Sequence, residues 1–415
     1  MALKRHRLCQ RRKALGFSQE RLAEALGVER STVARWENAE TDPQPWHRTR
    51  IAQALHVTLE QLDGMLVDVS VATGRGQAMG DDTRNPASAI RSQLLTGLRT
   101  FLTSYLPDPP AQPVPSLVNV RRGVVRLHAL YQRASYSSAA RLLPEVLRQA
   151  TELTDRAPGA RRADAFRLLA TAYIAASKLA TKVGDGDIAL LTADRASTAA
   201  RLANHRALAA LAAYQAACGL LRLPGRTDEA AAMTQTSIEH LVRDGRAKDR
   251  DLLSAHGALL LLAAVIAARQ DRRKDADGLL VQAEGLAAEL GSDQNRLWTG
   301  FGPTNVVIHT VSAAVGSRDA ERAFDVASRL DTSWLPAALV GRRAQVHVDL
   351  AAATAMGAKE SSLAVLHILE AERVAPEVVR ANAQVRTLLT DLQSKERRAA
   401  TPGLRPLAER AGLLA

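Results

Sequence analysis

Residues 18–37 read SQERLAEALGVERSTVARWE, and this stretch decides the fold of the N-terminal part of the chain. Its apolar side chains recur at the spacing of two amphipathic helices, at Leu22, Leu26, Val33 and Trp36. Gly27 follows the last apolar residue of the first helix, where a left-handed residue ends a helix at little steric cost. Ala23 is small at the point where the two helices approach each other. The stretch therefore predicts two short helices joined by a tight turn.

The flanking residues extend this pattern, because Gly16-Phe17-Ser18-Gln19 precedes the first helix and Arg35-Trp36-Glu37-Asn38 closes the second. With these flanks, residues 3–65 resemble the lambda-repressor-like, or XRE-type, helix-turn-helix domain of phage and bacterial regulators. The resemblance implies a five-helix domain that binds double-stranded DNA. The other three helices are expected at residues 4–14, 46–55 and 59–66. The alternative is a helix pair that does not bind DNA.

The second helix of the motif is expected to begin near Arg30 and to enter the major groove. Its outward residues are assigned to DNA contact, namely Arg30, Ser31, Thr32 and Arg35. Arginine can donate to both O6 and N7 of guanine, whereas serine and threonine can bond bases or phosphates. Arg35 is therefore the foremost candidate for reading a base. Further DNA contacts are expected from Arg11, Gln19, Asn38 and Arg48, with a solvated side chain as the alternative for Arg48.

The resemblance also implies an internal ion pair, because an arginine at the place of Arg12 often pairs with the glutamate that matches Glu37. We expect a partly buried bridge between them, and the alternative is a surface pair that contributes little to stability.

Two residues depart from the family pattern. Glu29 stands where a serine or threonine cap is usual, and Ala39 replaces a glycine, so Asn38 is expected to take the left-handed turn itself.

Length and composition favour a helical protein of several domains. A chain of 415 residues predicts two or three domains, and an aromatic content of 3% suits closely packed helices better than a β-sandwich. The chain has 55 basic and 43 acidic residues, a net charge of +12, and residues 1–36 hold nine basic residues against three acidic ones. We expect phosphate attraction there, although charge alone does not distinguish DNA from a membrane surface.

The sequence has no pattern typical of catalysis or metal binding. Cys9 and Cys218 are too few for a disulfide framework or a zinc site, and the ten histidines are scattered without a known catalytic motif. The N-terminus lacks the apolar segment of a signal peptide, and the longest apolar run, residues 257–268, is too short to span a bilayer. We therefore expect a cytoplasmic, nucleoid-associated protein without enzymatic activity, cofactor, metal or membrane contact.

The rest of the chain predicts an all-α fold. Residues 67–115 read as a linker with one helix near residues 88–106, because periodicity is lost and glycine and proline accumulate. From residue 116 to 394 the chain reads as paired helices, and the first helices begin near residues 117, 161, 205, 249, 303 and 336. Because the first four starts lie 44 residues apart, the pattern predicts an α-solenoid of stacked hairpins.

This region resembles tetratricopeptide (TPR) repeats, because Ala364, Ala371 and Pro376 keep the spacing of that repeat's second helix. The Trp-Leu-Gly-Tyr signature of the first helix is missing, so the resemblance is to a degenerate, TPR-like form. The segment WTGFGPTNVVIH, residues 298–309, resembles one in XRE/TPR-like regulators of actinobacteria. This resemblance implies a transcription factor whose solenoid dimerises and can sense a peptide or small-molecule effector.

The same segment contains candidate effector-binding residues. Asn305 and His309 are four residues apart on one helical face, near Trp298 and Phe301. An amide and an imidazole on one face can bond a peptide backbone, and the aromatic rings can supply apolar contact. The alternative is structural packing together with a helix cap after Pro303.

The basic tail, residues 395–415, is expected to be disordered, with a dimer-swapped helix or a phosphate contact as alternatives. The sequence as a whole predicts a homodimeric, sequence-specific DNA-binding regulator that recognises a near-palindromic operator. The rival hypothesis is a protein-interaction scaffold in which the small domain serves tethering or dimerisation.

Overall fold

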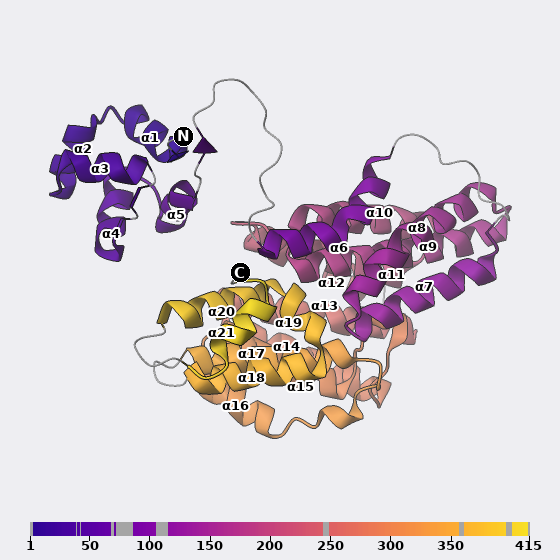
Figure 1. Ribbon diagram of the computed structural model, residues 1–415. Helices are drawn as coiled ribbons and strands as arrows, with labels where there is room; N and C mark the ends of the chain where they lie inside the picture. The colour runs from indigo at the N-terminus through magenta and orange to yellow at the C-terminus, as the bar shows by residue number, and fades with distance from the viewer. Residues whose placement is uncertain are drawn as a thin grey trace. The chain divides into compact units, whose positions relative to one another are not determined.

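The computed structural model describes residues 3–38, 40–41, 43–67, 70–71, 86–104, 115–243, 249–356, 361–395 and 401–413. The chain divides into two compact units, residues 1–80 and 81–415, and each is described here by itself. In the described residues both units are helical, and the sole sheet is a pair of two-residue strands in the first unit (Figure 1).

The first unit contains the five helices that the sequence predicts: α1 (His6–Ala14), α2 (Gln19–Leu26), α3 (Arg30–Glu37), α4 (Pro45–Ala54) and α5 (Leu59–Val67). The Ser18 hydroxyl accepts a hydrogen bond from the main-chain N–H of Arg21 at 3.1 Å, which caps α2. Gly27 ends α2 with φ 67° and ψ 38°, and the N–H of Val28 then donates to the carbonyl of Ala23 at 3.0 Å. This left-handed turn confirms the tight connection between α2 and α3.

One apolar core holds the five helices together. Its members include the residues of the motif's apolar stripe and their partners from the other helices: Leu8, Leu22, Ala23, Leu26, Val33, Trp36, Ile51, Leu55, Leu62 and Leu66. Burial of the predicted stripe is thereby confirmed.

Two features at the edge of this unit are not evident from the sequence. The strand β1 (Leu3–Lys4) pairs antiparallel with β2 (Ser70–Val71). The side chain of Arg5 is 5% exposed and donates to the carbonyls of Leu66 at 2.6 Å and Trp36 at 2.7 Å. Arg5 therefore ties the start of the chain to the ends of α3 and α5, which is why α1 begins at His6 rather than at Lys4.

In the second unit, paired helices follow one another as predicted. The first helices of the pairs are α7 (Leu117–Gln132), α9 (Ala160–Val183), α11 (Arg206–Leu220), α13 (Arg250–Arg269), α15 (Pro303–Gly316) and α17 (Val340–Ala355). Their partners are α8 (Tyr136–Arg156), α10 (Gly186–Leu202), α12 (Thr227–Arg243), α14 (Arg273–Leu290), α16 (Ala320–Ser328) and α18 (Ser361–Val374). The last pair was expected to begin near residue 336, but α17 begins at Val340 because the short helix η3 (Thr332–Trp334) precedes it. A similar short helix, η2 (Arg296–Trp298), precedes α15.

The helix pairs close into a ring rather than forming an open solenoid. The first helices pack side by side in chain order from α7 to α17, and α17 returns to contact α7. Each partner helix from α8 to α16 packs against two consecutive first helices, whereas α18 packs against α17 and α19 (Pro376–Ala381). No described residue of α10, α12, α14, α16 or α18 lines the central cavity. The first helices therefore form the inner wall of the ring.

Two expectations about the ends of this unit are wrong. The helix predicted near residues 88–106 is confirmed as α6 (Pro86–Thr103), but its place in a linker is wrong, because it packs against α8 and buries Leu95 and Leu98 in the main core. The C-terminal tail is ordered over residues 401–413, where α21 (Leu404–Arg410) buries Leu404 and Leu407 after α19 (Pro376–Ala381) and α20 (Ala383–Lys395). Both helices are amphipathic, and burial of their apolar faces overcomes the tendency of linkers and termini toward disorder. The other residues predicted to form the linker, 68–69, 72–85 and 105–114, lie outside the described residues.

α13 is a long apolar helix of the inner wall. It is long and apolar enough to cross a membrane by composition, but 72% of its most apolar window is buried inside this unit. Its Gly257 receives the ring of Phe301, which is 0% exposed; a Cβ at position 257 would lie 2.0 Å from Phe301 Cζ. The glycine is thus required by a close approach of α13 to the loop before α15.

We expect Gly257→Ala to destabilise the second unit by at least about 1–3 kcal/mol, because the added methyl group overpacks the core against Phe301. Gly278→Ala on α14 is the matched control, since no atom lies within 4 Å of a Cβ there and alanine favours the helix by up to about 1 kcal/mol. Urea unfolding followed by circular dichroism measures both changes. Equal unfolding midpoints for the two variants would contradict the packing argument.

Candidate functional site

Within the first unit, α3 presents a polar face to solvent. Arg30, Ser31 and Arg35 are exposed and Thr32 is half-buried. On the opposite side of the helix Val33 is 1% exposed and Trp36 4% exposed. Because the buried side chains fix the rotation of the helix, the four residues assigned to DNA are held on one accessible surface.

Local contacts arrange two of these residues. Arg30 Nε lies 2.7 Å from Glu20 Oε1 on α2, and both side chains are exposed. Such a surface pair is worth little, so the guanidinium remains available to a competing anion. Ser31 Oγ donates to Glu29 Oε2 at 3.1 Å, whereas the Glu29 side chain makes no capping hydrogen bond to α3. Glu29 therefore orients Ser31 and adds a negative charge beside the exposed polar face of α3.

Behind this face, Arg12 and Glu37 form the expected ion pair, and both side chains are only 6% exposed. Arg12 Nε and Nη2 donate to Glu37 Oε1 and Oε2 at 2.6 and 3.1 Å, a bidentate geometry. The hydrogen bonds that Arg12 donates to Glu37 are the main cause that raises the pKa of Arg12. Gln19 Nε2 donates to the same carboxylate at 2.7 Å. The pair is thus buried, and it joins α1, α2 and α3.

The other predicted DNA-contact residues all have internal hydrogen bonds. Arg11 donates to the carbonyls of Leu55 and His56, each at 2.9 Å, and so caps the end of α4. Arg48 Nε donates to the Pro43 carbonyl at 3.2 Å, and Asn38 Nδ2 donates to Glu40 Oε1 at 3.2 Å. Asn38 has φ −84° and ψ 4°, so the left-handed turn expected at this residue is wrong. DNA contact by Arg11, Gln19, Asn38 and Arg48 remains a prediction.

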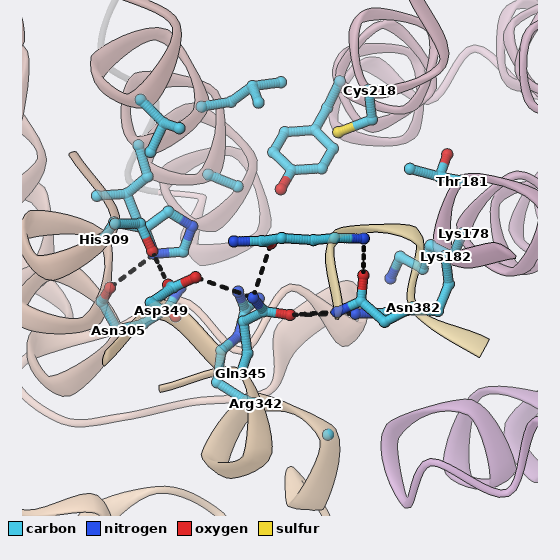
Figure 2. A pocket seen from close by; sticks show the side chains of 18 of the residues that line it. Lys178, Thr181, Lys182, Cys218, Asn305, His309, Arg342, Gln345, Asp349 and Asn382 are labelled. Carbon is cyan, nitrogen blue, oxygen red and sulfur yellow. Dashed lines mark hydrogen bonds between the residues drawn. The ribbon is translucent and has the colours of Figure 1, made fainter. Parts of the chain in front are cut away.

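A second candidate site is an open cavity of about 590 Å³ lined mainly by the inner helices of the second unit (Figure 2). Trp298, Asn305 and His309 line it, as the sequence motif suggested. Phe301 does not line the cavity, so its assignment to an effector is wrong: its ring fills the space left by Gly257 instead. The sequence could not separate these two aromatic residues because their environments depend on α13.

The side chains of Asn305 and His309 are nearly buried, at 2% and 9% exposed. His309 Nδ1 lies 2.8 Å from the main-chain oxygen of Asn305, one helical turn earlier. Burial, with the charge of Arg342, lowers the pKa of His309 to about 3. The imidazole is therefore neutral at physiological pH and can donate or accept one hydrogen bond.

The loop before α15 is held against the cavity in a strained conformation. Leu297 and Trp298 have φ values of 47° and 56°, a left-handed region that costs non-glycine residues about 1–3 kcal/mol each. The Trp298 carbonyl accepts from Lys178 Nζ at 2.9 Å and from Gln132 Nε2 at 3.4 Å, and its indole stacks on His128 at 4.3 Å. These contacts from α7 and α9 hold Trp298 at the cavity wall.

Sequence reasoning missed the cavity lysines, Lys178 and Lys182. They are four residues apart in an apolar, alanine-rich stretch of α9, a placement that puts both on one helical face. The sequence contained this indication of a functional site, because lysine rarely occurs among buried residues unless a partner or a ligand stabilises its charge. Burial lowers the pKa of Lys178 to about 7 and that of Lys182 to about 8, with Arg342 and Arg222 as further causes.

These lowered values predict how stability depends on pH. An unfolded lysine has a pKa near 10.5, so between about pH 7 and 10.5 the unfolded chain binds more protons than the folded one. Stability of the second unit should therefore rise with pH across this window, and below about pH 7 the destabilisation by Lys178 should stay constant at its full size. Thermal unfolding between pH 6.5 and 9.5 tests this. Lys178→Met should raise the melting temperature at pH 7 and reduce its increase with pH, whereas Lys274→Met on the surface should do neither.

Comparison with family models places a match over residues 10–62, to the family described as Helix-turn-helix (HTH_3). No curated protein and no solved structure matches the chain. The first unit thus contains an XRE-type helix-turn-helix domain, followed by a long all-helical region. Such a domain implies that DNA is a partner and that the protein acts in transcriptional regulation.

Proposed function

We propose that the protein is a sequence-specific transcriptional regulator that reads the major groove with α3. The observation that supports this most is the exposed row of Arg30, Ser31 and Arg35 on a helix whose opposite side is buried. Arg35 binds a base edge. Arg30 exchanges its ion pair with Glu20 for a base or a phosphate, and the hydroxyl groups of Ser31 and Thr32 donate further hydrogen bonds to the DNA. The ion pair of Arg12 and Glu37 fixes α3 in the orientation that DNA requires.

We infer further that two copies bind together. A single helix-turn-helix reads about one half-site, and two-fold symmetry then places half-site centres about 34 Å apart or at a multiple of that distance. The operator is accordingly a near-palindrome. The proposed oligomer is a homodimer formed through the TPR-like helical region, whose cavity senses a peptide or small molecule. The protein acts in the cytoplasm at the nucleoid and catalyses no reaction.

Selection of bound duplexes from a random pool, followed by sequencing, tests the function directly. A near-palindromic motif, bound at least about 1,000-fold more tightly than random duplex at physiological salt, is the expected result. Immunoprecipitation from cells then identifies the operators in use. Equal binding to all duplexes, or none at any salt concentration, would favour the rival hypothesis of a protein-interaction scaffold.

A further inference from the structure

The central cavity of the second unit carries an unbalanced positive charge. Six cationic side chains line it, at Lys178, Lys182, Arg222, Arg269, Arg318 and Arg342. Among the described residues of the lining, Asp349 is the single carboxylic acid. None of the six cations forms an ion pair within the described part of the chain.

Asp349 does not neutralise this charge. Its carboxylate is 4% exposed, accepts from Ser312 Oγ, and accepts from Gln345 Nε2 at 3.0 Å. Burial is the largest cause that raises its pKa. The carboxylate is thus hydrogen-bonded to neutral donors, and a single acid of the described lining faces six basic side chains, so it offsets only part of their charge.

The two lysines are largely unused as donors. Lys178 Nζ has the Trp298 carbonyl at 2.9 Å, and Lys182 Nζ has Gln345 Oε1 at 3.4 Å. An ammonium group can donate three hydrogen bonds, so both retain donors for another partner. Figure 2 shows Lys178, Lys182, Asn382 and Gln345 gathered at one side of the cavity. Lys178, Lys182 and Arg342 are half-buried in the cavity, whereas Arg222, Arg269 and Arg318 are exposed. Half-buried cations without a paired anion lose part of their hydration, and they are therefore expected where an anion binds.

The remaining lining gives the ligand a second, uncharged part. Ile174, Leu211, Leu261 and Tyr214 contribute apolar and aromatic surface. Asn305 is 2% exposed, and its Oδ1 has no hydrogen-bond partner among the described residues. A buried acceptor of this kind is satisfied by an ordered water or by a donor on a bound molecule. The volume of about 590 Å³ suits a small organic molecule rather than a folded peptide.

We propose that this cavity binds a small phosphate-bearing organic molecule, with the phosphoryl group at Lys178 and Lys182 and the organic part against the apolar wall. A phosphate monoester carries close to two negative charges and several acceptor oxygens, which matches paired ammonium groups backed by arginines better than a single carboxylate does. Asn305 accepts from a donor on the organic part. Binding of such a ligand does not depend on the proposed function of the protein. Only an effect of the ligand on DNA binding rests on the sensing role proposed above.

Isothermal titration of the full-length protein, without DNA and at 150 mM salt, tests the site with five probes: inorganic phosphate, pyrophosphate, AMP, glucose 6-phosphate and citrate. We expect at least one phosphate-bearing organic probe to bind more tightly than inorganic phosphate and than citrate. Lys178→Met and Lys182→Met should each weaken that binding at least tenfold. Lys274→Met, which removes a surface lysine on α14, should leave it unchanged.

Neither lysine forms an ion pair in the described part of the chain, and Gln132 still donates to the Trp298 carbonyl when Lys178 is replaced. Methionine is therefore expected to preserve the fold, and circular dichroism of each variant verifies this. Binding of none of the phosphate-bearing probes, binding that survives both methionine variants, or tighter binding of citrate overturns the proposal. DNA binding is measured separately in phosphate-free buffer. If no phosphate-bearing molecule binds in the cavity, the proposed role of α3 in DNA binding is unaffected. If the protein does not bind DNA, the result of the titration is likewise unaffected.

Discussion

Arg35→Ala is expected to weaken binding to the selected operator by about 1–3 kcal/mol while changing binding to random duplex much less. The physical reason is that a guanidinium bonded to O6 and N7 of guanine discriminates between bases, whereas phosphate attraction does not. Arg35 is exposed near the end of α3, and no ion pair in the described part of the chain holds it. The variant should also accept substitutions at one operator position that the parent protein rejects.

Fluorescence anisotropy with operator and random duplexes, at several salt concentrations, measures these changes. Arg329→Ala is the control, because it removes an exposed arginine from the second unit at the end of α16. It should leave both affinities unchanged. An equal loss on operator and random DNA for Arg35→Ala would show that Arg35 contacts phosphate and not a base.

Glu37→Ala is expected to cost the first unit about 3–5 kcal/mol, because it leaves Arg12 buried without its counter-charge. Gln19 loses its acceptor as well, so α1, α2 and α3 lose their common tie. A small domain has only about 5–15 kcal/mol of stability, and the recognition surface should therefore be partly unfolded at 37 °C. Operator binding should fall together with stability.

The matched control is Glu229→Ala, which breaks a bidentate pair of similar geometry on the surface. Arg226 Nε and Nη2 donate to Glu229 at 2.7 and 2.6 Å, but both side chains are exposed. That change should cost less than about 1 kcal/mol. Hydrogen exchange measured by mass spectrometry on the full chain reports each unit separately. Similar exchange in residues 18–37 of the parent and of Glu37→Ala would falsify the role given to the buried pair.

The N-terminal domain was predictable because its determinants are local. Gly27, the cap at Ser18 and the apolar stripe of α2 and α3 all lie within residues 18–37. The resemblance to a known motif added the pairing of Arg12 with Glu37, which spacing alone does not reveal. Arg5 was missed because its partners, Trp36 and Leu66, are distant in the sequence.

In the second unit, too, local features were predictable from the sequence and contacts between distant residues were not. Hydrophobic periodicity and turn residues predicted the inner helices close to their observed starts, because each helix pair is formed by neighbouring residues. The path of the pairs in space was not predictable in this way. Small rotations between successive pairs accumulate, and they decide whether the row stays open or closes.

By itself, therefore, the sequence determined an XRE-type helix-turn-helix followed by a long series of helix pairs. Only the tertiary structure decided that α17 meets α7, that Phe301 turns away to fill the space at Gly257, and that Lys178 faces Trp298. Contacts between residues more than one hundred positions apart gather the cations around one cavity. No local pattern encodes such contacts, because they arise from the packing of whole helices.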